Sequence, residues 1–274
     1  MTMPSASTGD TRPAHQTRAQ PYSPFVIQHG SSQSQSDQII ARFAGGMAHD
    51  FSNFLTVISG FAQFLQAQHR NNPELADGFG EILQAVSRAQ EMTEQLAVMG
   101  GQRPLAMTAC DFHEAIERMA ETMQRLVGVR IRIDLRCAST PGPVVRLDPA
   151  RFEELLTRLC RHAEAELPDG GSVTIDTARL PAEAMRDRPA WLPAGHYVRL
   201  SFHGAGAEVD PGLIGRCFEP FFLKLKCGRG TGLGLAVVYA LVKQHHGEIE
   251  VASGPGAGTT FHLYFPCEPH AATS

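Results

Sequence analysis

Apolar residues in the first third of the chain recur at alternating intervals of three and four. They occupy positions 40, 43, 47, 51, 54, 58, 61 and 65, and then positions 75, 79, 82, 86, 89, 92, 96 and 99. This spacing predicts two long amphipathic helices, because residues three and four apart lie on one face of an α-helix. Asn71-Asn72-Pro73 separates the two series and Gly100-Gly101 ends the second, so we expect an antiparallel helical hairpin.

Such a hairpin leaves much of each apolar face in water when it stands alone. Two copies that pair through these faces form a four-helix bundle, in which the apolar side chains are buried. We therefore expect a homodimer that forms through the hairpin.

From about Asp111 the sequence pattern changes to mixed helix and strand. Strand patterns cover 129–137, 173–177, 197–202, 248–253 and 259–265, and helix patterns cover 111–126, 148–167 and 235–245. Helices packed on one face of a mixed sheet form a two-layer arrangement. The predicted fold class is α+β: a long helical hairpin forming a dimeric four-helix bundle, followed by an α/β two-layer sandwich.

Composition sets the expected boundaries and excludes several functions. Residues 1–37 are rich in Ser, Gln, Thr and Pro and are expected to be disordered. The expected segments after them are the hairpin over 38–104, the α/β domain over 105–267 and a tail over 268–274. The formal charge of −4, with no basic cluster, argues against nucleic acid. The six cysteines lack zinc-type spacing, and no apolar run is long enough for a bilayer. We expect a cytoplasmic protein with reduced thiols and no membrane partner.

His49 lies on the opposite side of the first predicted helix from its apolar face. At 100° per residue it points about 160–200° away from positions 47 and 51. Asp50 follows it directly, and Asn53 lies one turn further along the same face. A carboxylate beside an exposed imidazole orients one ring nitrogen and leaves the other nucleophilic toward a phosphoryl group. The pattern indicates either a phosphoacceptor histidine or a chance histidine on a solvated face.

A glycine-rich segment directly precedes the last predicted helix. It reads GRGTGLGL over residues 228–235. The backbone N–H groups of such a loop and the dipole of the following helix can converge on a phosphate group. A flexible turn explains a glycine run equally well, so both interpretations stay open.

Together these segments resemble the histidine kinases of two-component signalling, over about residues 40–266. The stretch FAGGMAHDFSNFL (43–55) is similar to the phosphoacceptor box of that family, in which H-D-F-N-N-L-L is common, with Ser52 in place of an Asn. The stretches FEPFF (218–222) and GTGLGL (230–235) are similar to its phenylalanine box and its second glycine box. VKQHHG (242–247) and GTTF (258–261) follow in the expected order.

The resemblance implies roles for particular residues. His49 would be phosphorylated, Asp50 would be its acid/base partner, and Asn53 would support dephosphorylation of a response regulator. The nucleotide would be bound by Gly206, Gly230, Thr231, Gly232, Gly234, Leu235 and Thr260. The implied partners are the receiver domain of a response regulator and a second copy of the chain.

Two nucleotide-binding motifs depart from the family pattern. His162 stands where the family has a metal-binding Asn, and Ala165 stands where it has an Asp. Mg²⁺ prefers oxygen ligands, so no metal site is predicted. Gly204 replaces the Asp that accepts the adenine amino hydrogen bond, and Glu208 replaces a glycine near the expected phosphates. An unpaired adenine amino group costs roughly 1–3 kcal/mol. The sequence therefore predicts impaired ATP use, with ATP and Mg²⁺ as cofactors only if this site is functional.

Three functions fit these features. The first is a phosphotransfer or phosphatase protein in which His49 exchanges phosphoryl groups with a response regulator without ATP. The second is an autophosphorylating kinase with an atypical nucleotide site, in which His162 or Glu164 recruits the metal. The third is a non-enzymatic scaffold that dimerises through the hairpin.

Overall fold

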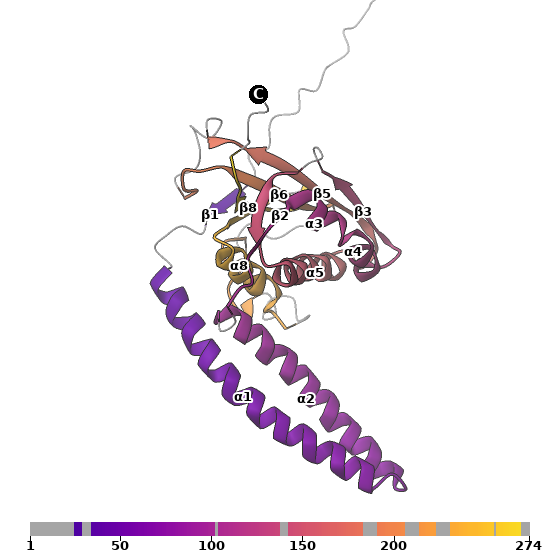
Figure 1. Ribbon diagram of the computed structural model, residues 1–274. Helices are drawn as coiled ribbons and strands as arrows, with labels where there is room; N and C mark the ends of the chain where they lie inside the picture. The colour runs from indigo at the N-terminus through magenta and orange to yellow at the C-terminus, as the bar shows by residue number, and fades with distance from the viewer. Residues whose placement is uncertain are drawn as a thin grey trace, which may run out of the picture.

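The computed structural model describes residues 25–28, 34–101, 104–137, 142–182, 191–205, 214–222, 231–254 and 256–269. Its N-terminal part is the predicted antiparallel hairpin, formed by α1 (Ser34–Gln68) and α2 (Pro73–Met99) (Figure 1). Asn72 caps α2, because its side-chain oxygen accepts a hydrogen bond from the Leu75 N–H at 3.3 Å. Pro73 then supplies the first helical residue, where its missing N–H costs nothing.

From residue 46 on, where the structure describes its side chains, the hairpin buries few of them and exposes many large apolar ones. Ala48, Ala62, Val86 and Thr93 are buried. The exposed apolar residues, which we call the apolar stripe, are Met47, Phe51, Phe54, Val57, Ile58, Phe61, Phe64, Leu75 and Ile82. An exposed apolar surface of this extent marks an interaction site. Although α1 has 35 residues, no helix among the described residues combines the length and the apolar character needed to span a bilayer.

The second part of the chain is built on a six-stranded mixed sheet with the order β1-β7-β8-β6-β5-β3. The strands are β1 (Phe25–Gln28), β3 (Ile131–Arg136), β5 (Gly171–Leu180), β6 (Tyr197–Ala205), β7 (Glu248–Gly254) and β8 (Gly258–Pro266). Among these strands only β3 and β5 pair in parallel; the other pairs are antiparallel. A separate antiparallel pair consists of β2 (Thr108–Asp111) and β4 (Val144–Leu147).

Among the described residues, four helices accompany the sheet: α3 (Phe112–Glu117), α4 (Ala120–Val127), α5 (Pro149–Glu166) and α8 (Gly234–Gln244). Figure 1 shows α5 and α8 side by side beneath the sheet, with the hairpin on their far side. The buried core lies between these helices and the sheet, where Phe112, Phe152 and Phe265 pack with ring centroids 5.5–5.8 Å apart. This two-layer arrangement confirms the predicted α+β fold.

Three local predictions need correction. The N-terminal segment predicted to be disordered contains β1, which pairs with β7, and α1 begins at Ser34 within the same segment; residues 1–24 and 29–33 lie outside the described residues. The helix predicted over 111–126 is two helices, α3 and α4, because the Met119 N–H bonds to the Ile116 carbonyl and tightens the chain between them. The paired strands β2 and β4 are both absent from the predicted elements.

The hairpin docks on the α/β domain through the end of α2. Val98 and Met99 pack against the domain core, and the Gln244 side chain at the end of α8 donates to the Val98 carbonyl at 2.6 Å. Gln95, one turn earlier on α2, accepts a hydrogen bond from the Thr231 hydroxyl at 3.0 Å. The two parts of the chain therefore meet along α8.

Candidate functional site

The structure places His49 on the solvent side of α1, as the helical spacing predicts. Its side chain is 72% exposed, and that of Asp50 is 73% exposed. The His49 Nδ1 lies 3.3 Å from an Asp50 carboxylate oxygen. When Nδ1–H donates to this carboxylate, the lone pair of the ring is carried by Nε2. Nε2 is then the nucleophile that faces solvent.

Asn53 shares the exposed face with His49. Four residues along a helix correspond to about 40° of rotation and ~6 Å of rise, so Asn53 lies one turn beyond the imidazole, and its side chain is exposed. Gly46 and Gly60 on the same helix have open space where a side chain would begin. A second protein can therefore approach this face closely between Gly46 and Gly60, over about four turns.

The segments expected to bind nucleotide converge around Phe261 on β8. The His162 ring on α5 packs edge-on against Phe261 with centroids 5.4 Å apart, and Phe218 packs on Phe261 at 6.4 Å and on Tyr239 of α8 at 5.7 Å. The neighbouring Thr260 shares a 2.9 Å hydrogen bond with His203 on β6. Motifs that are far apart in the sequence thus meet at one place in the fold.

The glycine-rich segment is described from Thr231 onward, whereas Gly206 and Gly230 lie outside the described residues. Gly232 has a φ of 72°, which favours glycine, and its carbonyl accepts a hydrogen bond from the Phe221 N–H at 2.8 Å. A side chain at Gly234, the first residue of α8, would meet nothing within 4 Å. Leu235, by contrast, is buried in the hydrophobic core and supports the helix from within.

The metal-binding position of this site holds an imidazole in apolar surroundings. Burial lowers the pKa of His162 to about 4, so the ring is neutral at pH 7. Ala165 and Glu164 on the same helix are exposed. Within the described parts of the chain, no three His, Cys, Asp or Glu side chains cluster as metal ligands. The residues present do not fit the oxygen coordination that Mg²⁺ requires.

Gly204 stands where the resemblance implies an acceptor for the adenine amino group. Gly204 lies near the end of β6, paired with Val173 on one side and Thr259 on the other. A side chain at Gly258, where φ is 71°, would collide with the Gly204 carbonyl, so the two backbones pack directly together. Gly204 offers no carboxylate to accept an adenine amino hydrogen. Glu208, the other departure in this motif, lies outside the described residues.

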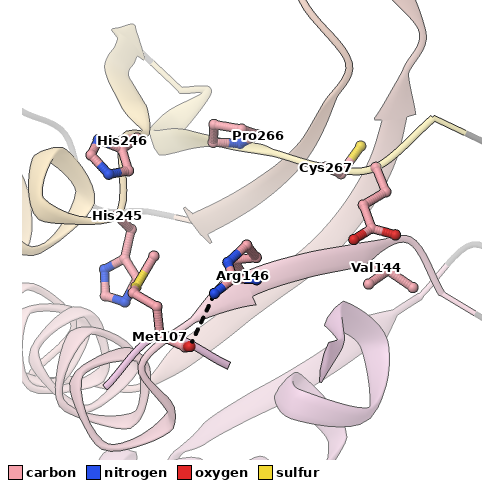
Figure 2. Close-up of a pocket in the computed structure, with 8 residues that line it drawn as sticks. Met107, Val144, Arg146, His245, His246, Pro266 and Cys267 are labelled. Carbon is pink, nitrogen blue, oxygen red and sulfur yellow. Dashed lines mark hydrogen bonds between the residues drawn. The ribbon is translucent and has the colours of Figure 1, made fainter. Parts of the chain in front are cut away.

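A cavity of about 450 Å³ lies at the opposite end of α8 (Figure 2). It is lined by Met107, Val144, Arg146, His245, His246, Pro266, Cys267 and Glu268. His245 has structural partners on both ring nitrogens: Nδ1–H donates to the Leu241 carbonyl at 2.7 Å, and Nε2 accepts from the Asp148 N–H at 3.1 Å. None of the predicted site residues lines this cavity, so it is separate from the nucleotide-type site.

Two family descriptions match this chain. Residues 39–99 match the His Kinase A (phospho-acceptor) domain, and residues 147–269 match the histidine kinase-, DNA gyrase B- and HSP90-like ATPases. The first range contains His49, Asp50 and Asn53, and the second contains the segments that meet at Phe261.

Several characterised proteins are similar in sequence. The sensory histidine kinase/phosphatase NtrB of Klebsiella oxytoca is 30% identical over 89% of this chain and 68% of its own length. The sensor kinase CckA of Brucella abortus is 32% identical over 88% of this chain, which spans only 26% of that protein. Sporulation kinase C of Bacillus subtilis is 24% identical, and this chain spans 50% of it. The chain therefore corresponds to between a quarter and two thirds of these relatives.

One solved structure is similar in fold over both parts of the chain. Full-length ShkA, crystallised in complex with AMPPNP, superposes with a TM-score of 0.61 over 84% of this chain and 46% of its own. Its sequence identity to this chain is 22%. This similarity supports the arrangement of a hairpin followed by an α/β domain.

Proposed function

Because this chain belongs to the sensor histidine kinase family, we propose that it exchanges phosphoryl groups between His49 and the receiver domain of a response regulator, or removes them from it, with little use of ATP. One contrast carries this proposal. The His49 face is complete and open, whereas the nucleotide-type site has neither an oxygen ligand at His162 nor an adenine acceptor at Gly204. The relative NtrB is described as both kinase and phosphatase.

The His49 face supplies the groups for reversible transfer. Nε2 of His49 attacks the phosphorus of a receiver aspartyl phosphate, the bond to the aspartate oxygen breaks, and the carboxylate leaves. The Asp50 carboxylate, 3.3 Å from Nδ1, stabilises the positive charge that develops on the ring. The reverse steps return the phosphoryl group to a receiver. In dephosphorylation, water attacks instead, and the Asn53 amide orients it.

Transfer of a phosphoryl group from a phosphorylated receiver domain to this chain tests this function. Receiver domains labelled with radioactive acetyl phosphate would be incubated with the full chain without nucleotide. We expect loss of label from the receiver and appearance of acid-labile, base-stable phosphate on the chain. A set of receivers that all keep their label, with none transferred to the chain, would contradict the proposal.

An ATP-dependent kinase is the second candidate, because residues 147–269 match the ATPase family and a side chain at Gly234, the first residue of α8, would meet no neighbour within 4 Å. We expect the wild-type chain to bind MgATP only at millimolar concentration. The double variant His162→Asn/Gly204→Asp restores an oxygen ligand and an adenine acceptor, and should bind roughly tenfold or more tightly in calorimetry. His69→Asn, the same replacement at an exposed position, is the control. Micromolar binding by the wild type would establish the second candidate instead.

We also propose that the hairpin over residues 38–104 forms a homodimer through the apolar stripe, and that residues 105–267 act as its nucleotide-binding-type partner domain. Ile58 and Phe61 are 47% and 66% exposed, and burial of each such side chain contributes about 1.5–3 kcal/mol. Ile58→Asp/Phe61→Asp should therefore raise the dimer dissociation constant at least roughly a hundredfold in analytical ultracentrifugation. Gln63→Asp, also exposed on α1, should leave it unchanged. Equal sedimentation of all three chains would refute this interface.

A further inference from the structure

Gln95 links the hairpin to the glycine-rich segment. Its side-chain oxygen accepts a hydrogen bond from the Thr231 hydroxyl at 3.0 Å. The same hydroxyl accepts a hydrogen bond from the Leu233 N–H at 3.2 Å. Leu233 directly precedes α8, so its N–H is one of the groups at the helix start that lack an intrahelical acceptor. Thr231 is thus fixed by the hairpin on one side and by the helix end on the other.

The backbones on both sides of this contact are held in place. Close to Gln95 on α2, the Val98 carbonyl accepts a hydrogen bond from Gln244 at 2.6 Å, and Val98 packs against the domain core. On the domain side, the Gly232 carbonyl is bonded to the Phe221 N–H. The Gln95–Thr231 hydrogen bond therefore joins two anchored segments.

Gln95 also lies at the level of His49 along the hairpin. The Gln66 side chain of α1 donates to the Ala76 carbonyl of α2 at 3.2 Å, which sets the alignment of the two antiparallel helices. His49 is 17 residues before Gln66, so it lies opposite the residue 17 positions after Ala76, which is Thr93. At 1.5 Å per residue, Gln95 is within about 3 Å of that level. Thr231 is therefore held beside α2, at about the same height along the hairpin as the His49 side chain on α1.

We propose that Gln95 is a positioning residue for the nucleotide-type site. Its hydrogen bond holds Thr231 in the conformation in which the Thr231 hydroxyl occupies the Leu233 N–H, so this donor at the start of α8 is not available to an anionic group. A phosphate that binds there must replace the Thr231 hydroxyl as the acceptor of the Leu233 N–H, and the helix dipole favours this exchange. Phosphate binding and release of α2 from the domain then favour each other, because coupling between two equilibria is reciprocal. This inference goes beyond the proposed function, which concerns His49.

Amide hydrogen exchange of the full chain without nucleotide tests the contact directly. Gln95→Ala should speed exchange over residues 231–236 by roughly two- to tenfold, the range expected for the loss of one neutral hydrogen bond. Gln95→Glu keeps an oxygen that accepts from the Thr231 hydroxyl and should restore the wild-type rate. Gln84→Ala, an exposed glutamine on the same helix, should have no effect. Unchanged exchange in Gln95→Ala, or equal acceleration in Gln84→Ala, would overturn the proposal.

Nucleotide binding provides a readout that a purely structural role would not move. With MgATP as the probe in calorimetry, Gln95→Ala should bind roughly two- to tenfold more tightly than wild type, and Gln95→Glu more weakly because of its negative charge. A Gln95→Ala chain that binds ATP measurably but no more tightly than wild type would contradict the inference. If neither the wild type nor Gln95→Ala binds ATP, the amide hydrogen exchange rates alone test the proposal. Neither readout uses His49, so failure of phosphotransfer would leave this result intact.

Discussion

His49→Ala should lower the rate of phosphoryl transfer from a phosphorylated receiver domain to this chain by at least roughly a thousandfold. Alanine has no nucleophilic nitrogen, and no other group on the exposed face replaces it. The measurement is acid-labile phosphate on the chain after incubation with a labelled receiver. The variant should still fold and dimerise, since the His49 side chain is 72% exposed and the apolar stripe is unchanged.

Two neighbouring variants separate transfer from dephosphorylation. Asn53→Ala should reduce the release of inorganic phosphate by roughly tenfold or more while His49 is still labelled, because the amide would orient water rather than carry the phosphoryl group. Ser52→Ala changes an exposed residue between Asp50 and Asn53 and serves as the matched control. Full signalling by a His49→Ala chain would instead support the scaffold function.

Acidification should destabilise the folded chain well before its carboxylates are protonated. Burial lowers the pKa of His162 and of His262 to about 4, and also lowers the pKa of His245. A buried neutral imidazole contributes stability that is present above its unfolded pKa of about 6.5 and is lost as the pH falls toward its folded pKa. For His162 this loss is on the order of 3 kcal/mol between pH 7 and pH 4.

Urea unfolding at pH 7, 5.5 and 4.5 measures this effect. His162→Phe keeps an aromatic ring beside Phe261 but does not titrate, so its free energy of unfolding should fall less steeply with acid. His69→Phe, at an exposed position, should follow the wild-type curve. Identical pH dependence for His162→Phe and the wild type would show that this imidazole is not held neutral by burial.

Local patterns in the sequence were sufficient for the elements that carry the site. The three-and-four spacing predicted both long helices and placed His49 away from the apolar stripe. Asp111 and Asp148 are the first residues of two predicted helices, and they cap α3 and α5 because each carboxylate accepts backbone N–H groups of the following turn. These features depend on residues within one turn of each other, which is the range over which sequence patterns are reliable.

The missed features depend on contacts between distant residues. Thr231 and Gln95 are 136 positions apart, so no local pattern indicates their hydrogen bond. The residues Phe25, Val26 and Ile27 of β1 favour a strand, but so short a run within a polar segment does not indicate that it pairs with β7. The break between α3 and α4 has no Gly or Pro to mark it and follows from packing of Ile116 and Met119 in the core. Leu235 is one of the residues expected to bind nucleotide, but it is a residue of the hydrophobic core.

The pairing of β1 with β7 has a consequence for the range of domain movement. The chain leaves β1 at Gln28 and enters α1 at Ser34, so the five residues 29–33 span at most about 22 Å even when fully extended. The other covalent connection, residues 102–103 and the short run before β2, leaves from the end of α2, which is the same end of the hairpin. While β1 stays paired, two short covalent connections join the α/β domain to the hairpin. The domain can swing about the line that joins them, but it cannot travel freely to the far end of the bundle.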